Sequence, residues 1–263
     1  MELRLRCGVQ LRYYSGNVSD HREHPRGPET QTARSRPRLA DLTAAFGLLT
    51  ALPVGRPDPH GEMFARATLW FPIVGLVMGA LLSALDQLVT SQLPPWVAAT
   101  LLVVTWECVG SVIPLRRTVS ANPGTVKWST AIAIVGLLTA KIVGLALQPA
   151  TRSAALLFAP TLGRWTMVVL ATGARDAGAP ARKFNPGITF REFAVTSVFT
   201  FAVCFGVAEF AGILLIVCAA GFTLLMRLVL HRWFDGVSLV TLWLGCEAVE
   251  ATVVLLLAVA AGG

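Results

Sequence analysis

The stretch VTSVFTFAVCFGVAEFAGILLIVCAAGFTLLMRLVL, residues 195–230, decides the fold class of this chain. It is almost continuously apolar, and only Glu209 and Arg227 carry a charge. A helix needs roughly 17–25 residues to cross the hydrocarbon of a bilayer, so the stretch is long enough for two crossings. Glu209 and Gly212 lie near its middle and mark a tight turn. The stretch therefore predicts two membrane spans joined by a short connection.

The composition of the whole chain also indicates a membrane protein. Of its 263 residues, 54% are hydrophobic and 14% are charged, whereas soluble chains are about 45–50% apolar and roughly 25% charged. This balance excludes a water-soluble enzyme, a coiled coil and a disordered regulator. The net charge is +7, but the cations border apolar segments. We therefore attribute them to orientation in a membrane and expect no nucleic-acid partner.

Cysteine and histidine give no sign of a disulfide or a zinc site. The cysteines form no CxxC pair and four of them lie in apolar runs, so we interpret those four as small buried hydrophobic residues. The histidines lie far apart in the sequence, which argues against zinc. The residues concerned are Cys7, Cys108, Cys204, Cys218 and Cys246, with His21, His24, His60 and His231.

Residues 1–38 differ from the rest of the chain because they are polar and rich in Arg, Ser and Pro. They contain eight Arg against four acidic residues. No apolar stretch of signal-peptide length follows the early arginines, so they are not a secretory signal. We expect a disordered basic cytoplasmic leader or an overextended start site; a basic tether at the membrane surface is the alternative. Residues 39–263 are expected to form a single integral-membrane domain.

The apolar segments of that domain predict an all-α fold, a polytopic membrane helical bundle of about seven transmembrane helices. The segment 39–54 is too short to cross and ends near Pro53, so we interpret it as one short interfacial or re-entrant helix. Gly75 and Gly79 form a GxxxG pattern, which lets two helix backbones approach closely. The predicted spans are about 67–90, 96–113, 128–148, 154–172, 193–208, 210–230 and 239–260.

The charges of the connecting loops predict the orientation of the bundle. The connections on one side carry ten Lys and Arg, and those on the opposite side carry only Arg152. Because cytoplasmic loops carry the excess of basic residues, we expect a multi-pass protein of the cell inner (plasma) membrane with its long loops in the cytoplasm. The basic connections are 55–66, 114–127, 173–192 and 231–238.

Ionisable residues inside spans usually face the bundle interior or a polar cavity. Glu247 and Glu250 are three residues apart and share one helical face. Two like charges there need a cation, a shared proton or basic partners. We expect Arg164 as their counter-ion and Lys141 as the second choice. The group forms either an interhelical ion-pair network or a polar substrate cavity. The other ionisable residues in spans are Glu107 and Arg227, and Arg227 lies near a helix end, where snorkelling explains it.

The two long basic loops are candidates for binding phosphate. Arg116, Arg117 and Lys127 lie in the 114–127 loop, and Arg can grip a phosphate by two parallel hydrogen bonds. The 173–192 loop carries four more cations. The alternative is that these cations serve orientation alone.

Five segments carry a family resemblance when they are taken in order. FGLLTALPVG at 46–55 is similar to a Phe-x-x-x-Thr-x-Leu-Pro-Val opening, and MFARATLWFPIVGLVMGALL at 63–82 to an aromatic-rich helix with a Phe-Pro-x-x-Gly run. AIAIVGLLTAKIVGL at 131–145 and APTLGRWTMVVL at 159–170 match helices that carry a single Lys and a single Arg. DGVSLVTLWLGCEAVEA at 235–251 resembles a closing motif that ends in Glu-x-x-Glu. Together they resemble the cobalamin synthase family of integral-membrane adenosylcobinamide-GDP ribazoletransferases.

The resemblance implies a reaction of cobalamin (vitamin B12) biosynthesis. Adenosylcobinamide-GDP and alpha-ribazole, or its 5′-phosphate, would be the small-molecule substrates, giving adenosylcobalamin (or its phosphate) and GMP, with Mg²⁺ as the implied cofactor. In this chain Glu107, Glu247 and Glu250 are the candidate catalytic residues and metal ligands. The candidate substrate- and phosphate-binding residues are Arg116, Arg117, Lys127, Lys141 and Arg164.

The acidic signature of that family is degenerate in this chain. No Asp occurs between Asp86 and Asp176, Glu107 is the only acid in that interval, and Val240 stands where the closing motif has Asp. Mg²⁺ needs oxygen ligands, which an apolar replacement cannot supply. The alternative function is therefore a catalytically inactive cobalamin synthase-like membrane protein that binds a corrinoid or a membrane partner. A transporter-like role rests on the charged spans alone.

Overall fold

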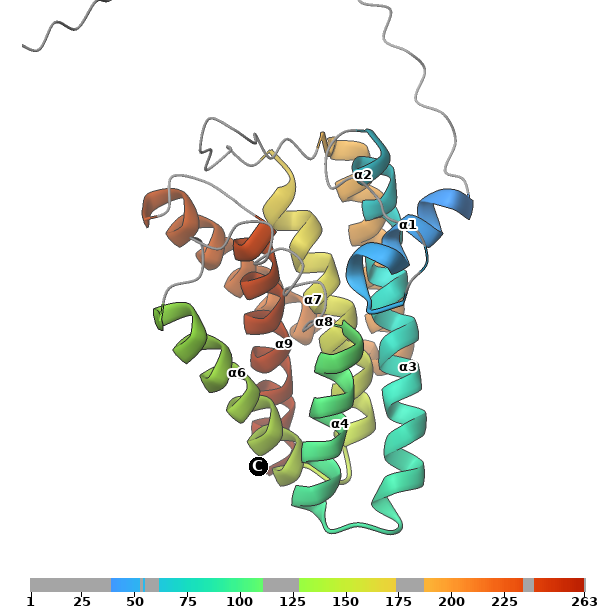
Figure 1. The fold of residues 1–263 in the computed structure, drawn as a ribbon, viewed down its shortest axis with the longest axis vertical. Coiled ribbons are helices and arrows are strands. Elements are labelled where there is room, and N and C mark those ends of the chain that lie inside the picture. Colours follow the sequence, from blue (N-terminus) through green and yellow to red (C-terminus); the bar gives the residue numbers. More distant parts are fainter. Residues whose placement is uncertain are drawn as a thin grey trace, which may run out of the picture. The chain divides into compact units, whose positions relative to one another are not determined.

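A computed structural model describes residues 39–52, 54, 62–110, 128–173, 187–233 and 239–262. Every regular element in this part of the chain is a helix, which confirms the predicted all-α class (Figure 1). The predicted leader, residues 1–38, lies outside the described residues, as does most of both long basic loops.

The helices follow the predicted apolar segments closely. α1 lies within the predicted interfacial segment, and the short α2 and η1 lead directly into α3. The elements are α1 (Leu39–Leu49), α2 (Glu62–Ala67), η1 (Thr68–Trp70), α3 (Phe71–Thr90), α4 (Pro95–Gly110), α6 (Trp128–Leu147), α7 (Arg152–Ala171), α8 (Phe190–Trp233) and α9 (Leu239–Gly262).

Four of the described helical stretches are long and apolar enough to cross a membrane. They are Met63–Thr90, Arg152–Ala171, Phe190–Leu230 and Val240–Ala261. The apolar helices Leu39–Leu49, Pro95–Gly110 and Ala131–Leu147 are shorter. The chain therefore has the apolar helices of a membrane protein, whereas the predicted count of seven spans is not confirmed.

The long α8 is broken at the residue that the sequence marked as a turn. Glu209 has non-helical backbone angles, with φ 49° and ψ −128°. Beyond it, a Cβ added to Gly212 would collide with the backbone carbonyl of Cys204. Residues eight apart meet in this way only when the chain folds back on itself, because a straight helix rises about 1.5 Å per residue. The segments before and after Glu209 are thus two helices, as predicted.

The GxxxG pattern brings α3 against α7. A Cβ on Gly79 would lie 2.7 Å from the carbonyl oxygens of Leu156 and Leu157, and a Cβ on Gly75 would lie 2.8 Å from Cα of Thr161. Pro160 has no N–H to donate to the Leu156 carbonyl, so α7 has a free backbone acceptor at this point. Only glycine allows α3 to pass so close, which confirms the predicted packing role of the pattern.

α7 is the central helix of the described bundle. About 89% of its apolar window is buried, against 22% for the α8 window Phe190–Leu230, although α7 is the less apolar of the two. In a bilayer this distribution is expected, because lipid contacts the most apolar helices and polar side chains are tolerated where other helices surround them. Polar residues on α7 are therefore directed into the bundle.

A buried cluster of hydrogen-bonded polar side chains joins α3 to the start of α7. Arg152 is fully buried; its Nη1 donates to Oδ1 of Asp86 at 3.2 Å, and its Nε donates to the carbonyl of Leu145 at 2.9 Å. Thr90 and Ser153 also donate to the Asp86 carboxylate, at 2.7 and 3.0 Å. Arg152 was the one basic residue counted against the predicted orientation. In the structure Arg152 is the first residue of α7 and the buried counter-ion of Asp86 on α3, so it is not a loop charge.

Asp86→Ala is expected to lower the free energy of unfolding by roughly 3–5 kcal/mol, because it leaves the buried guanidinium of Arg152 without a counter-ion. The measurement is the thermal unfolding midpoint in detergent. Gln87→Ala, at the exposed neighbouring position, is the matched control and should change the midpoint little. Equal midpoints for the two variants would contradict a stabilising role for the Asp86–Arg152 pair.

Candidate active site

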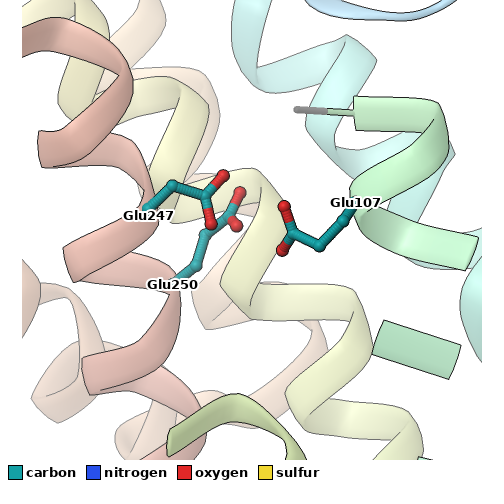
Figure 2. Close-up of side chains that lie close together, drawn as sticks. All are labelled: Glu107, Glu247 and Glu250. Atoms are coloured by element: carbon teal, nitrogen blue, oxygen red, sulfur yellow. The ribbon is translucent and has the colours of Figure 1, made fainter. Parts of the chain in front are cut away.

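Three glutamates from two helices converge inside the bundle. Glu107 lies near the end of α4, and Glu247 and Glu250 lie one helical turn apart on α9 (Figure 2). One carboxylate oxygen of each lies within 4.8 Å of the others. The sequence placed Glu247 and Glu250 on one face, and the structure adds Glu107 to them. We call these three residues the glutamate trio.

Lys141 of α6 lies at the centre of the trio. Its Nζ donates to Oε1 of Glu107 at 2.7 Å, to Oε2 of Glu247 at 2.5 Å and to Oε2 of Glu250 at 2.6 Å. The ammonium group is completely buried. The residue that the sequence ranked as the second counter-ion is thus the one that contacts all three carboxylates.

Arg164 of α7 completes the charge cluster from the other side. It donates from Nη1 to Oε1 of Glu250, which confirms it as a counter-ion of the closing motif, and to Sγ of Cys246 at 3.1 Å. Its own helix makes room for this contact, because a Cβ on Gly163 would lie 2.6 Å from Cγ of Glu250. Glu250 therefore receives one cation on each carboxylate oxygen.

Aromatic rings and sulfur atoms surround the two cations. Nζ of Lys141 lies 4.4 Å from the ring centroid of Trp106, and Cζ of Arg164 lies 5.8 Å from that of Trp243. Nη2 of Arg164 is 3.8 Å from Sδ of Met78. Aromatic faces attract cations, most strongly where water is excluded. These side chains shield the cluster from the apolar surroundings.

The cluster has few routes to the outside. Lys141, Arg164 and Glu250 are completely buried, whereas Glu107 and Glu247 keep 7% and 8% of their surface exposed. Three carboxylates against two cations give a net charge of −1 when all five are ionised. Among the three glutamates, Glu107 and Glu247 are therefore the ones that keep some exposed surface.

The remaining predicted site residues cannot be placed. Arg116, Arg117 and Lys127 lie outside the described residues, so their phosphate-binding role stays a prediction. The loop that holds Arg116 and Arg117 follows α4 directly, and Glu107 lies one turn before that end of α4.

Lys141 and Arg164 were also predicted to bind substrate. In the structure they bind carboxylates, since a buried cation needs a partner of opposite charge.

Sequence reasoning missed the role of several neighbours of the cluster. Cys246 was interpreted as a small buried hydrophobic residue; it is buried, but its thiol lies between Arg164 and Glu250. Its position four residues before Glu250, on the same helical face, was the available signal. Trp106 precedes Glu107, and no sequence spacing relates it to Lys141.

The glutamate trio does not fit a magnesium ion as it stands. A bound Mg²⁺ lies about 2.0–2.1 Å from its oxygen ligands, so an ion at the centre of the trio would coincide with Nζ of Lys141. The donor chemistry is suitable, because carboxylate oxygens are the ligands that Mg²⁺ prefers. The position is not, because the ammonium already bridges all three carboxylates.

Comparison with known proteins relates these residues to a family. The profile described as cobalamin-5-phosphate synthase matches residues 41–113, which include most of α1 and all of α3 and α4, with Glu107. No solved structure matches the chain significantly.

Curated relatives extend this similarity over the rest of the chain. A protein of Roseiflexus sp. (strain RS-1) named adenosylcobinamide-GDP ribazoletransferase is 28% identical over 232 residues, covering 78% of this chain and 85% of the relative. One of Synechococcus sp. with the same name is 29% identical over 146 residues, covering 49% of this chain and 57% of the relative. One of Halorubrum lacusprofundi, again of that name, is 39% identical over 66 residues, a quarter of each chain. With the family profile on α1 to α4 and a relative aligned along most of its length, the chain is similar to the cobalamin synthase family.

Proposed function

We propose that this chain is an adenosylcobinamide-GDP ribazoletransferase of cobalamin biosynthesis. It would join adenosylcobinamide-GDP to alpha-ribazole, or to its 5′-phosphate, and release GMP. The observation that carries the proposal is the convergence of Glu107, Glu247 and Glu250 with Lys141 and Arg164 at one centre. These residues come from four helices. Lys141, Arg164 and the two glutamates of α9 lie in segments that resemble the family, and Glu107 lies within the residues that the family profile matches.

The proposed reaction is a phosphoryl transfer. The alcohol oxygen of alpha-ribazole attacks the phosphorus that bears the cobinamide; a new P–O bond forms and the P–O bond to GMP breaks. The alcohol proton passes to a base, and GMP departs as an anion. Such reactions depend mainly on positioning and on neutralising the developing negative charge.

The roles of this chain's residues follow from exposure and charge. Glu107 and Glu247 keep part of their surface exposed and are the proposed acceptors of the alcohol proton. Arg116, Arg117 and Lys127 are proposed to neutralise the phosphate oxygens. Lys141, Arg164 and the buried Glu250 hold these carboxylates in place, and we propose that their effect on the substrate acts through the glutamates.

A second candidate function is a family member without turnover that binds a corrinoid or a membrane partner. Two observations favour it: the interval between Asp86 and Asp176 holds no Asp, and Lys141 fills the centre of the one carboxylate cluster found in the described residues. Only the proposal of an active ribazoletransferase includes a requirement for Mg²⁺. A diphosphate substrate offers this ion oxygen ligands of its own.

The deciding experiment measures GMP release by the purified full chain, supplied with adenosylcobinamide-GDP and alpha-ribazole, with and without Mg²⁺. Complementation of a strain that lacks the synthase is the parallel test in cells. GMP release that requires both substrates supports the ribazoletransferase. Corrinoid binding without GMP release supports the inactive relative.

We further propose that the protein is a multi-pass protein of the inner membrane with its long basic loops in the cytoplasm. In Figure 1 the α3–α4 connection, the α6–α7 connection and the C-terminal end of α9 lie at the same end of the bundle, which we propose faces away from the cytoplasm. A reporter that is active only in the cytoplasm is expected to be active in the 173–192 loop and inactive after residue 263. The reverse result would overturn the proposed orientation.

A further inference from the structure

We propose that the ammonium group of Lys141 is the resident cation of the glutamate trio, in the position that a divalent ion would otherwise take. The centre formed by Glu107, Glu247 and Glu250 is then independent of metal. This inference concerns the state of the folded chain and does not depend on whether the chain turns over substrate.

The contacts of Lys141 match the three carboxylates one to one. A lysine ammonium has three N–H donors and no acceptor, and here each N–H faces an oxygen of a different glutamate at 2.5–2.7 Å. The Trp106 ring lies 4.4 Å from Nζ and adds a cation–π contact. Every N–H donor of the ammonium has an acceptor, and these contacts stabilise the group at the centre of the trio.

The charges oppose a second cation beside Lys141. Arg164 already binds the other oxygen of Glu250, so a divalent ion in the trio would share three carboxylates with two resident cations. With a dication at the centre, Lys141 would lie a few ångströms from two positive charges in a site that excludes water. Repulsion at this distance is strong because little solvent screens it.

The same geometry indicates what removal of the ammonium would do. The three oxygens lie within 4.8 Å of one another, close to the span of ligands around one hard cation. Without Nζ the three converging carboxylates would lose the cation that they share, while Arg164 would still bind Glu250. Lys141→Met keeps the length of the side chain near the Trp106 ring and removes the charge. We infer that this variant acquires a divalent-ion site that the unmutated chain lacks.

The test uses Mn²⁺ as a paramagnetic probe for Mg²⁺ on the purified full chain in detergent, read by electron paramagnetic resonance. Lys141→Met is expected to gain one saturable Mn²⁺ site per chain, and its thermal midpoint is expected to rise as Mn²⁺ is added. Lys141→Met combined with Glu247→Gln should lose both effects. Lys141→Met combined with Glu209→Gln, which removes an exposed carboxylate in the α8 turn, is the matched control and should keep them.

The unmutated chain supplies a second, independent comparison. It is expected to bind the same amount of Mn²⁺ as Glu247→Gln, because its trio holds no metal. Saturable Mn²⁺ binding by the unmutated chain that disappears in Glu247→Gln would overturn the proposal, as would a folded Lys141→Met without any gain. If Lys141→Met does not accumulate, the comparison of the unmutated chain with Glu247→Gln decides the question alone.

Discussion

Arg164→Met is expected to destabilise the protein by roughly 3–5 kcal/mol, whereas Arg164→Met combined with Glu250→Gln is expected to cost clearly less. The single change leaves Glu250 completely buried with one of its two cations removed. The double change also removes the negative charge of Glu250, so the penalty for an uncompensated carboxylate in the bundle interior disappears. Non-additivity of this kind is the signature of a direct interaction between two residues.

The measurement is the thermal unfolding midpoint in detergent, where 1 kcal/mol corresponds to roughly 2–4 °C for a chain of about this size. Glu250→Gln alone completes the cycle. Arg191→Met removes an arginine that is exposed at the start of α8 and is the control for loss of a positive charge; it should change little. Additive effects of Arg164→Met and Glu250→Gln would refute the pairing.

The positions of the helices could be predicted from the sequence because lipid imposes a simple rule. Backbone groups in a bilayer must be satisfied within the segment, so apolar stretches of sufficient length become helices. The same rule makes Glu209 conspicuous inside an apolar run, and the structure places the break of α8 there. Gly75 and Gly79 could be assigned to helix packing because no other residue type lets two backbones approach so closely.

The composition of the candidate site could be predicted only in part. Glu247 and Glu250 share a face because of their spacing, and a buried pair of carboxylates required a basic partner. Which cation lies at the centre depends on how far α6 slides along α4 and α9, and no sequence period records that. Depth within a span favoured Arg164, whereas packing between α6 and its neighbours placed Lys141 against all three carboxylates. Glu107 joins the trio for the same reason.

The family relationship and the degenerate signature lead to different expectations for Glu107. A relative aligned over most of the chain carries the name of a transferase, and Glu107 is the only acid left between Asp86 and Asp176. If the chain is the proposed ribazoletransferase, the proton of the attacking alcohol needs an acceptor close to the loop after α4. Glu107 keeps 7% of its surface exposed, lies one turn before the end of α4 and fulfils this condition.

Glu107→Gln is therefore expected to lower kcat for GMP release by roughly 10²–10⁴-fold, the usual contribution of a general base. The amide keeps the size of the side chain and an oxygen that can accept from Lys141, so the thermal midpoint should fall far less than for Arg164→Met. Glu209→Gln removes an exposed carboxylate in the α8 turn and should leave kcat unchanged. A counter-ion without a catalytic role does not act on the substrate, so its replacement leaves kcat nearly unchanged whatever it does to the midpoint. A lowered midpoint with a nearly unchanged kcat would thus assign Glu107 to the ion-pair network, and the search for the base would move to Glu247.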